Sequence, residues 1–140
     1  MSLLYAISFD VGSKNIGVAV GQNITRTAKP INSLKAIHGI PDIKKIKKLF
    51  NIWNPNIIII GLPLNMDGSI QNSINLYINK FINFIKRNFK IKIKLCDERL
   101  TTIEARSKIF KLKGYKYLKK SKIDSESASI ILENWFNKNI

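Results

Sequence analysis

Four acidic side chains stand where chemistry is possible. The 140 residues contain only nine aspartates and glutamates, so their placement is informative. Asp10 ends an apolar run before a glycine turn, Asp97 and Glu98 end a later apolar segment, and Asp124 stands near the start of the last expected helix. Ligands of open α/β sheets bind at the carboxyl ends of strands. We therefore expect these carboxylates to converge at one sheet edge.

Converging carboxylates repel one another unless a cation joins them. Oxygen ligands of this kind suit Mg²⁺ or Mn²⁺. A carboxylate cluster that holds two such ions activates water and stabilises the leaving oxygen when a phosphodiester bond is cleaved. The acids therefore predict a metal-dependent site for phosphodiester hydrolysis.

Each acid also has a structural interpretation. Asp10 can accept hydrogen bonds from the amides of its own turn. Glu98 can pair with Arg99 on the surface. Asp124 fits the last position of a capping box that begins at Ser121. The residue types alone leave these alternatives open.

The charge points to a polyanionic partner. Twenty-four lysines and arginines against nine acids give a formal net charge of +15. Lysines recur from residue 108 to 122, with Tyr115 and Tyr117 among them. Lysines bind phosphates and tyrosines stack on unpaired bases. The residues expected to bind nucleic acid are Lys14, Arg99, Lys116, Lys119, Lys120 and Lys122. The alternative is a solvated loop in a chain whose abundant isoleucine, lysine and asparagine reflect AT-rich codons.

Composition excludes several classes of protein. The single cysteine permits neither an intrachain disulfide nor a cysteine-based zinc site, and the single histidine disfavours histidine-ligated metals. No apolar run approaches the ~20 residues of a membrane helix, and the first residues lack the basic start of a secretory signal. We expect a cytoplasmic protein with one domain over residues 1–140.

Hydrophobic periodicity predicts the elements that position these residues. The expected strands are 3–9, 15–20, 24–37 with an interruption near Pro30, 57–60 as a central strand, and 91–95 near a sheet edge. The expected helices begin at Pro41, near residue 74, at Thr101 and near Ile123. Gly12 is expected to turn the first hairpin with a positive φ. The order predicts an α/β fold with a mixed five-stranded sheet flanked by helices, in which an antiparallel meander precedes the crossover helices.

Four sequence blocks resemble the YqgF family, whose members are known as Holliday junction resolvases and as pre-16S rRNA nucleases. The blocks are residues 9–19 (FDVGSKNIGVA), 61–69 (GLPLNMDGS), 97–102 (DERLTT) and 124–128 (DSESA). They follow in order along essentially the whole chain. The resemblance implies an RNase H-like fold related to the RuvC resolvases. It also implies a cytoplasmic nuclease that uses Mg²⁺ or Mn²⁺ and matures the 5′ end of 16S ribosomal RNA.

The resemblance assigns the catalytic and metal-binding triad to Asp10, Glu98 and Asp124. Asp97 is then a residue that supports Glu98 or replaces it. RuvC resolvases carry their second acid at the end of the fourth strand, where this chain has Gly61 and Leu62. The partner implied is precursor ribosomal RNA or a pre-ribosomal particle, and monomer and homodimer both stay open.

Three other functions fit parts of the sequence. A DNA junction resolvase would act on branched DNA. A non-catalytic RNA-binding assembly factor would use its acids structurally. The turn after Asp10 is similar to the phosphate-binding hairpin of actin-like ATPases and sugar kinases, which need two such domains and hence a longer chain.

The lysines of residues 108–122 generate a prediction. Each phosphate neutralised on a single strand contributes roughly −0.7 to the slope of log affinity against log salt concentration. Replacing Lys116, Lys119 and Lys120 with alanine should flatten that slope and weaken binding without sequence preference. RNA titrations at several salt concentrations measure it, and an unchanged slope would identify the segment as a solvated loop.

Overall fold

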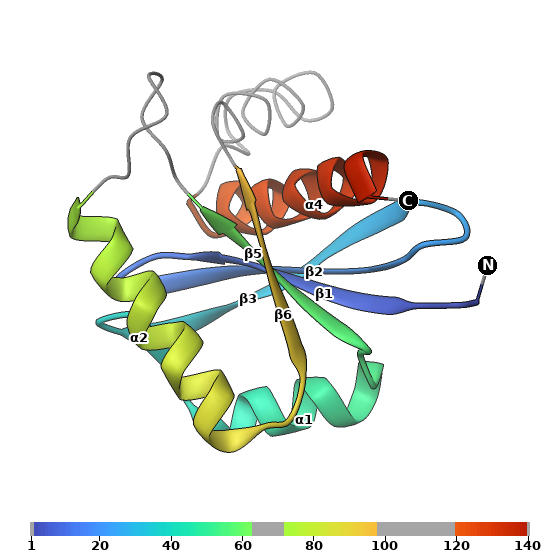
Figure 1. Ribbon diagram of the computed structural model, residues 1–140. Coiled ribbons are helices and arrows are strands. Elements are labelled where there is room, and N and C mark those ends of the chain that lie inside the picture. The colour runs from blue at the N-terminus through green and yellow to red at the C-terminus, as the bar shows by residue number, and fades with distance from the viewer. Residues whose placement is uncertain (1, 63–71, 98–119, 140) are drawn as a thin grey trace.

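The computed structural model describes residues 2–62, 72–97 and 120–139, which form a sheet between two layers of helices (Figure 1). The strands are β1 (Tyr5–Val11), β2 (Asn15–Gln22), β3 (Thr27–Ile37), β4 (Ile40–Pro41), β5 (Ile57–Leu62) and β6 (Lys92–Asp97). The helices are α1 (Ile43–Trp53), α2 (Asn72–Asn88) and α4 (Lys120–Asn139). The expected third helix from Thr101 lies outside the described residues. None of the described helices is long and apolar enough to cross a membrane.

The sheet order is β4-β3-β2-β1-β5-β6. Strands β1 to β4 pair antiparallel in sequence, and β5 and β6 then add in parallel beside β1. The predicted meander followed by crossover helices is therefore confirmed.

The expected count of five strands was wrong because the short β4 was missed. His38 and Gly39 have φ values of 51° and 84°. Positive φ at both central residues is the requirement of a type I′ hairpin turn. The turn brings Ile40 back beside Ile37 and so creates a sixth strand of two residues. His38 lies in this turn.

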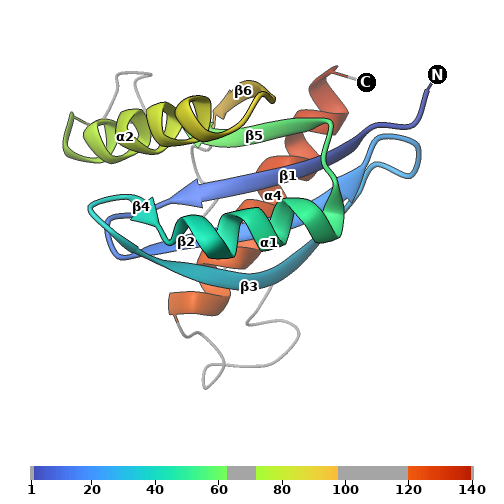
Figure 2. The same ribbon diagram turned by 90° about the horizontal axis from the view of Figure 1, so that it is seen from below.

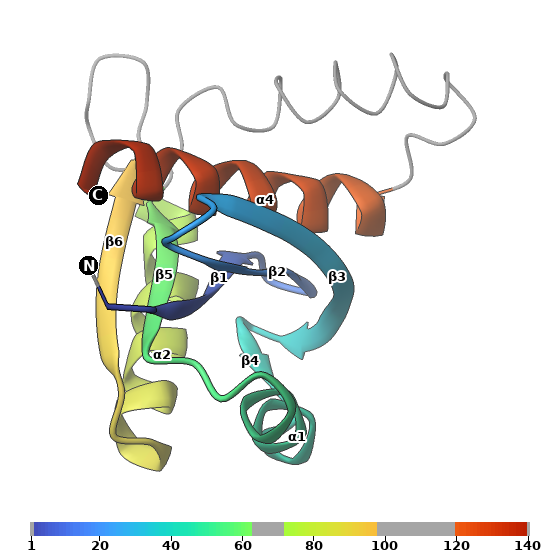
Figure 3. The same cartoon turned by 90° about the vertical axis from the view of Figure 1, so that its right-hand side faces the viewer.

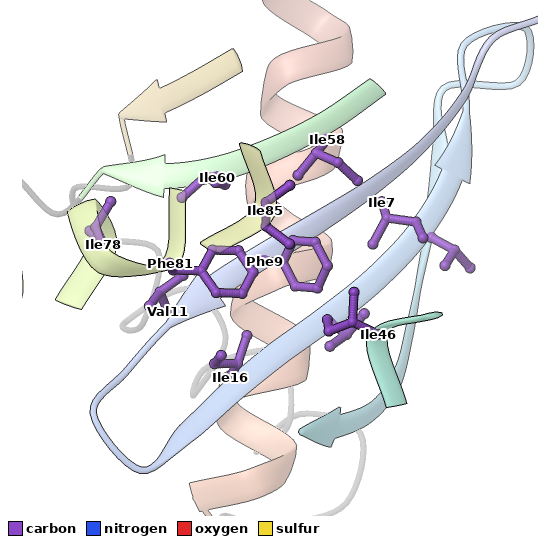
Figure 4. Close-up of a cluster of buried hydrophobic side chains, with 12 residues drawn as sticks. Ile7, Phe9, Val11, Ile16, Ile46, Ile58, Ile60, Ile78, Phe81 and Ile85 are labelled. Atoms are coloured by element: carbon purple, nitrogen blue, oxygen red, sulfur yellow. The ribbon is translucent and has the colours of Figure 1, made fainter. Parts of the chain in front are cut away.

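Helices α1 and α2 cover one face of the sheet and α4 covers the other (Figure 3). The larger core, drawn in Figure 4, packs β1, β2 and β5 against α1 and α2. In it the rings of Phe9 and Phe81 meet edge to face with centroids 5.0 Å apart, a geometry worth about 0.5–1.5 kcal/mol beyond simple burial. The smaller core places Ile131, Leu132 and Phe136 of α4 on the opposite face.

The isoleucine run of β5 is the central strand that the sequence predicts. Ile58 and Ile60 enter the larger core while Ile57 and Ile59 enter the smaller one. Both faces of the strand are therefore buried, which is typical of a parallel strand covered by helices on two sides.

The expected interruption of the third strand is displaced. Pro30 stays within β3, opposite Ala19, where no described strand pairs with the other edge. The register shift falls instead between the pairs that Ile16 and Val18 make with β3.

Two helix starts also differ from the expectation. Pro41 belongs to β4, and α1 begins at Ile43 after Asp42, whose side chain accepts a hydrogen bond from the Lys44 amide. A capping carboxylate therefore sets the start of α1. The described part of α4 already includes Lys120, before the expected start near Ile123. Ser121 thus lies within the helix, and the capping-box interpretation of Asp124 was wrong.

Candidate active site

Asp10 stands next to the end of β1 and faces α4. Side chains alternate along a strand, and Ile7, Phe9 and Val11 all enter the core beneath α1 and α2. Asp10 therefore shares the opposite face with Ser8. The carboxylate is partly buried, at the carboxyl edge of the parallel strands.

The turn after Asp10 is closed by backbone contacts. The Gly12 amide donates to the Asn15 carbonyl oxygen over 3.0 Å. A Cβ atom on Gly12 would lie 2.7 Å from that same oxygen, which is closer than real Cβ atoms approach. Gly12 is not among the described glycines with positive φ, so the expected reason for this glycine was wrong. The close approach of two backbone segments requires it.

Serine hydroxyls fasten α4 to the sheet. Three of them donate to backbone carbonyls between 94 and 120 residues away in sequence: Ser8 to Ala128 over 2.6 Å, Ser125 to Ile31 over 2.6 Å, and Ser129 to Ala28 over 3.4 Å. Sequence analysis missed these groups, although Ser8 interrupts an otherwise apolar strand interior and Ser125 and Ser129 stand one helical turn apart. These contacts fix the position of α4 above the sheet.

The same contacts fix which end of α4 lies near Asp10. Ser129 binds the Ala28 carbonyl of β3, and Ser125 binds the Ile31 carbonyl. Across β2, Ala28 is aligned with Ala6 of β1 and Ile31 is aligned with Phe9. From Ser129 back to Ser125, one helical turn toward the start of α4, the helix therefore advances from the level of Ala6 toward the carboxyl end of β1. The backbone of Asp124, at the start of that turn, lies on the way to the end of β1 where Asp10 stands. The side chain of Asp124 lies outside the described part of the structure.

The end of β6 supplies the neighbouring acid. Asp97 pairs with Leu62 at the carboxyl end of β5. The preceding Cys96 is buried toward α4, with its Sγ 3.7 Å from the Ile131 carbonyl oxygen. Alternation then directs Asp97 to the other face of the sheet from Asp10. Glu98, the next residue, lies outside the described residues.

Of the residues expected to bind nucleic acid, the structure describes one side chain. Lys14 is exposed in the turn that follows Asp10. Lys120 and Lys122 lie in the first turn of α4, and their side chains are outside the described part. Arg99, Lys116 and Lys119 are outside it altogether, as is the segment 63–69 that continues from β5.

Asp10 is the member of the expected triad whose side chain the structure describes, and it is partly buried on the α4 face. In the part of the chain that the structure describes, no three histidine, cysteine, aspartate or glutamate side chains form a metal-binding group. The other two expected ligands, Glu98 and Asp124, have side chains outside that part. Carboxylate oxygens are the donors that Mg²⁺ and Mn²⁺ prefer, so the residue types fit such a metal.

Comparison with known proteins identifies relatives over nearly the whole chain. The family model described as "RuvX: Holliday junction resolvase" matches residues 4–138. A protein of Wigglesworthia glossinidia brevipalpis named "Putative pre-16S rRNA nuclease" is 53% identical over 131 residues, covering 94% of this chain and 90% of the relative. One of the same name from Buchnera aphidicola subsp. Schizaphis graminum is 50% identical over 137 residues, covering 98% and 99%.

Solved structures share the fold at low sequence identity. Thermus thermophilus RuvC in complex with a Holliday junction substrate superposes with a TM-score of 0.56 at 9% identity, covering 96% of this chain and 94% of that one. Fowlpox virus resolvase in complex with Holliday junction DNA gives a TM-score of 0.55 at 20% identity, covering 96% and 98%. These likenesses confirm the predicted RNase H-like fold.

The contact between Ser8 and α4 generates a prediction. Ser8→Ala removes a buried 2.6 Å hydrogen bond and should lower the free energy of unfolding by about 0.5–1.5 kcal/mol. Ser129→Ala is the matched control in the same interface, and its 3.4 Å contact should contribute less. Urea unfolding measures both variants. Equal losses would show that the short hydrogen bond is not what fastens α4 to β1.

Proposed function

Because the chain belongs to the RuvX (YqgF) family of Holliday junction resolvases, we propose that this nuclease hydrolyses a phosphodiester bond near the 5′ end of precursor 16S ribosomal RNA. The observation that carries the site assignment is the position of Asp10. It stands next to the end of β1 on the face that α4 covers, at the edge toward which the start of α4 runs. The close relatives named as pre-16S rRNA nucleases support the choice of substrate.

We propose Asp10, Glu98 and Asp124 as the catalytic and metal-binding residues. Asp97 points away from Asp10 by strand alternation. This orientation disfavours Asp97 as the ligand and agrees with the choice of Glu98 that the resemblance implies. The assignment takes one carboxylate each from the end of β1, the segment after β6 and the start of α4.

Mg²⁺ or Mn²⁺ held by these carboxylates would supply activation of water and stabilisation of the leaving oxygen. The chain itself contributes position. Strand β1 is hydrogen-bonded to β2 on one side and β5 on the other, so the backbone of Asp10 has little freedom. Lys14, exposed in the next turn, is placed to hold a phosphate of the substrate. The substrate is found in the cytoplasm, which is where we place the protein.

Cleavage of a DNA junction is the second candidate. The description of the matching family model favours it. Branched DNA and precursor RNA present the same scissile group to the carboxylates. The two functions therefore differ in the substrate that the surrounding surface accepts.

A cleavage assay separates the candidates. Purified protein with Mg²⁺ or Mn²⁺ should cut a precursor 16S leader, and Asp10→Asn should abolish cutting while RNA binding in EDTA stays nearly intact. A four-way DNA junction is assayed beside it. Cutting of the junction alone would establish the second candidate, and cutting of RNA by Asp10→Asn would contradict the catalytic assignment.

Thermal melts of Asp10→Asn test whether the carboxylate binds metal or secures its turn. A metal ligand predicts unchanged or slightly higher stability without metal, because removing one of three clustered charges relieves repulsion. Wild type should gain about 2.7 kcal/mol at a hundredfold excess of Mg²⁺ over its dissociation constant, and the variant much less. A purely structural role predicts instead a loss of about 1.5–3 kcal/mol without metal. Asp42→Asn is the matched control, because asparagine caps helices as well as aspartate does and the stabilisation by Mg²⁺ should persist.

A further inference from the structure

A groove lies beside the turn that follows Asp10, on the side of the sheet that carries α1. Its volume is about 780 Å³, within the usual range of ligand sites. Figure 2 shows the β1–β2 turn, the β3–β4 hairpin and the start of α1 together at one end of the molecule. These three segments line the groove.

The groove is basic. Lys14 of the turn, Lys35 of β3 and Lys45 of α1 line it, and all three are exposed. The acid among the lining residues is Asp42, whose Oδ1 accepts a hydrogen bond from the Lys44 amide over 2.9 Å. That carboxylate caps the N-terminus of α1. Three lysines from separate elements therefore face one shared space, which suits a ligand with repeated negative charges.

The walls of the groove are joined by backbone hydrogen bonds. The Ala36 amide donates to the Lys14 carbonyl over 2.8 Å, and the Gly39 amide donates to the Ser13 carbonyl over 3.0 Å. Asn15 also pairs with Lys35 between β2 and β3. The backbones that carry two of the three lysines are thus fixed relative to each other and to the turn after Asp10. A ligand does not have to assemble this part of the groove.

An apolar surface completes the groove. Ile37 lines it and is 76% exposed, and Ile40 lies across the hairpin turn. A strand of nucleic acid offers phosphates for the lysines and the faces of sugars and bases for the isoleucines.

We propose that this groove binds the sugar–phosphate backbone of the substrate strand beside the bond that is cleaved, with Lys14, Lys35 and Lys45 each on a phosphate. The proposal rests on the proposed nuclease function, which identifies the ligand as the substrate. Asp10 and Lys14 flank one turn of the chain. A strand leaving the carboxylates therefore reaches the groove by passing over that turn.

Binding of a fluorescently labelled oligouridylate, measured by anisotropy in EDTA over a series of KCl concentrations, tests the groove. The variant with Lys14→Ala, Lys35→Ala and Lys45→Ala should bind more weakly. Its slope of log affinity against log salt should be shallower by about 2, at roughly 0.7 for each phosphate that a lysine no longer neutralises. The control variant carries Lys29→Ala, Lys86→Ala and Lys92→Ala, which removes the same number of exposed charges elsewhere. Its slope should match wild type.

Equal flattening by the two triple variants would show a diffuse positive surface and overturn the groove, and so would a groove variant that keeps the wild-type slope. Circular dichroism checks folding. If the triple variant fails to fold, single Lys35→Ala and Lys45→Ala variants, each expected to change the slope by about 0.7, decide the question. The measurement needs no cleavage. A chain that cuts no substrate but binds RNA less tightly without these lysines would refute the nuclease and keep the groove.

Discussion

The pairing register of β1 is the constraint on which the rest of the structure depends. This strand is hydrogen-bonded along both edges, and Phe9 and Ala6 bury its opposite faces in separate cores. A slip of one residue would exchange the faces. Asp10 would then enter the apolar core beneath α2, where an unpaired carboxylate is strongly unfavourable. The same register of β1 therefore packs both cores and places the Asp10 carboxylate on the α4 face.

Elements that leave a periodic pattern in the sequence were predicted, whereas elements set by backbone conformation or tertiary pairing were not. The isoleucines of β5 and the apolar stripe of α2 are visible as periodicity, so the central strand and second helix were predicted. Strand β4 depends on positive φ at His38, which no periodicity reports. Proline's preference for a first helical turn predicts a helix at Pro41, but pairing with Ala36 holds it in β4 and Asp42 caps the helix. Tertiary pairing overrode a local preference there.

The residues of the candidate site were also predictable from the sequence only in part. The position of Asp10 next to a strand end followed from one apolar run, and the structure bears it out. The hydroxyls of Ser8 and Ser125 could not be assigned, because their acceptors are 120 and 94 residues away. Sequence analysis missed Lys35 and Lys45 for a related reason. They belong to different elements, and the β3–β4 hairpin brings them beside Lys14.

A nuclease faces an electrostatic conflict, since the carboxylates that hold a cation repel the phosphates that must come near. Separating the two signs of charge by a short, rigid connection resolves it. Asp10 faces α4 and Lys14 opens toward α1, with a turn between them that spans at most about 14 Å even when fully extended. At physiological ionic strength the Debye length is about 8 Å, so salt weakens the interaction between the Asp10 carboxylate and the lysines beyond the turn, and under the proposed function those lysines remain available to a phosphate backbone. The Gly12 amide, bonded to Asn15, closes the turn, and a side chain at that position would force the two charged sites to shift relative to each other.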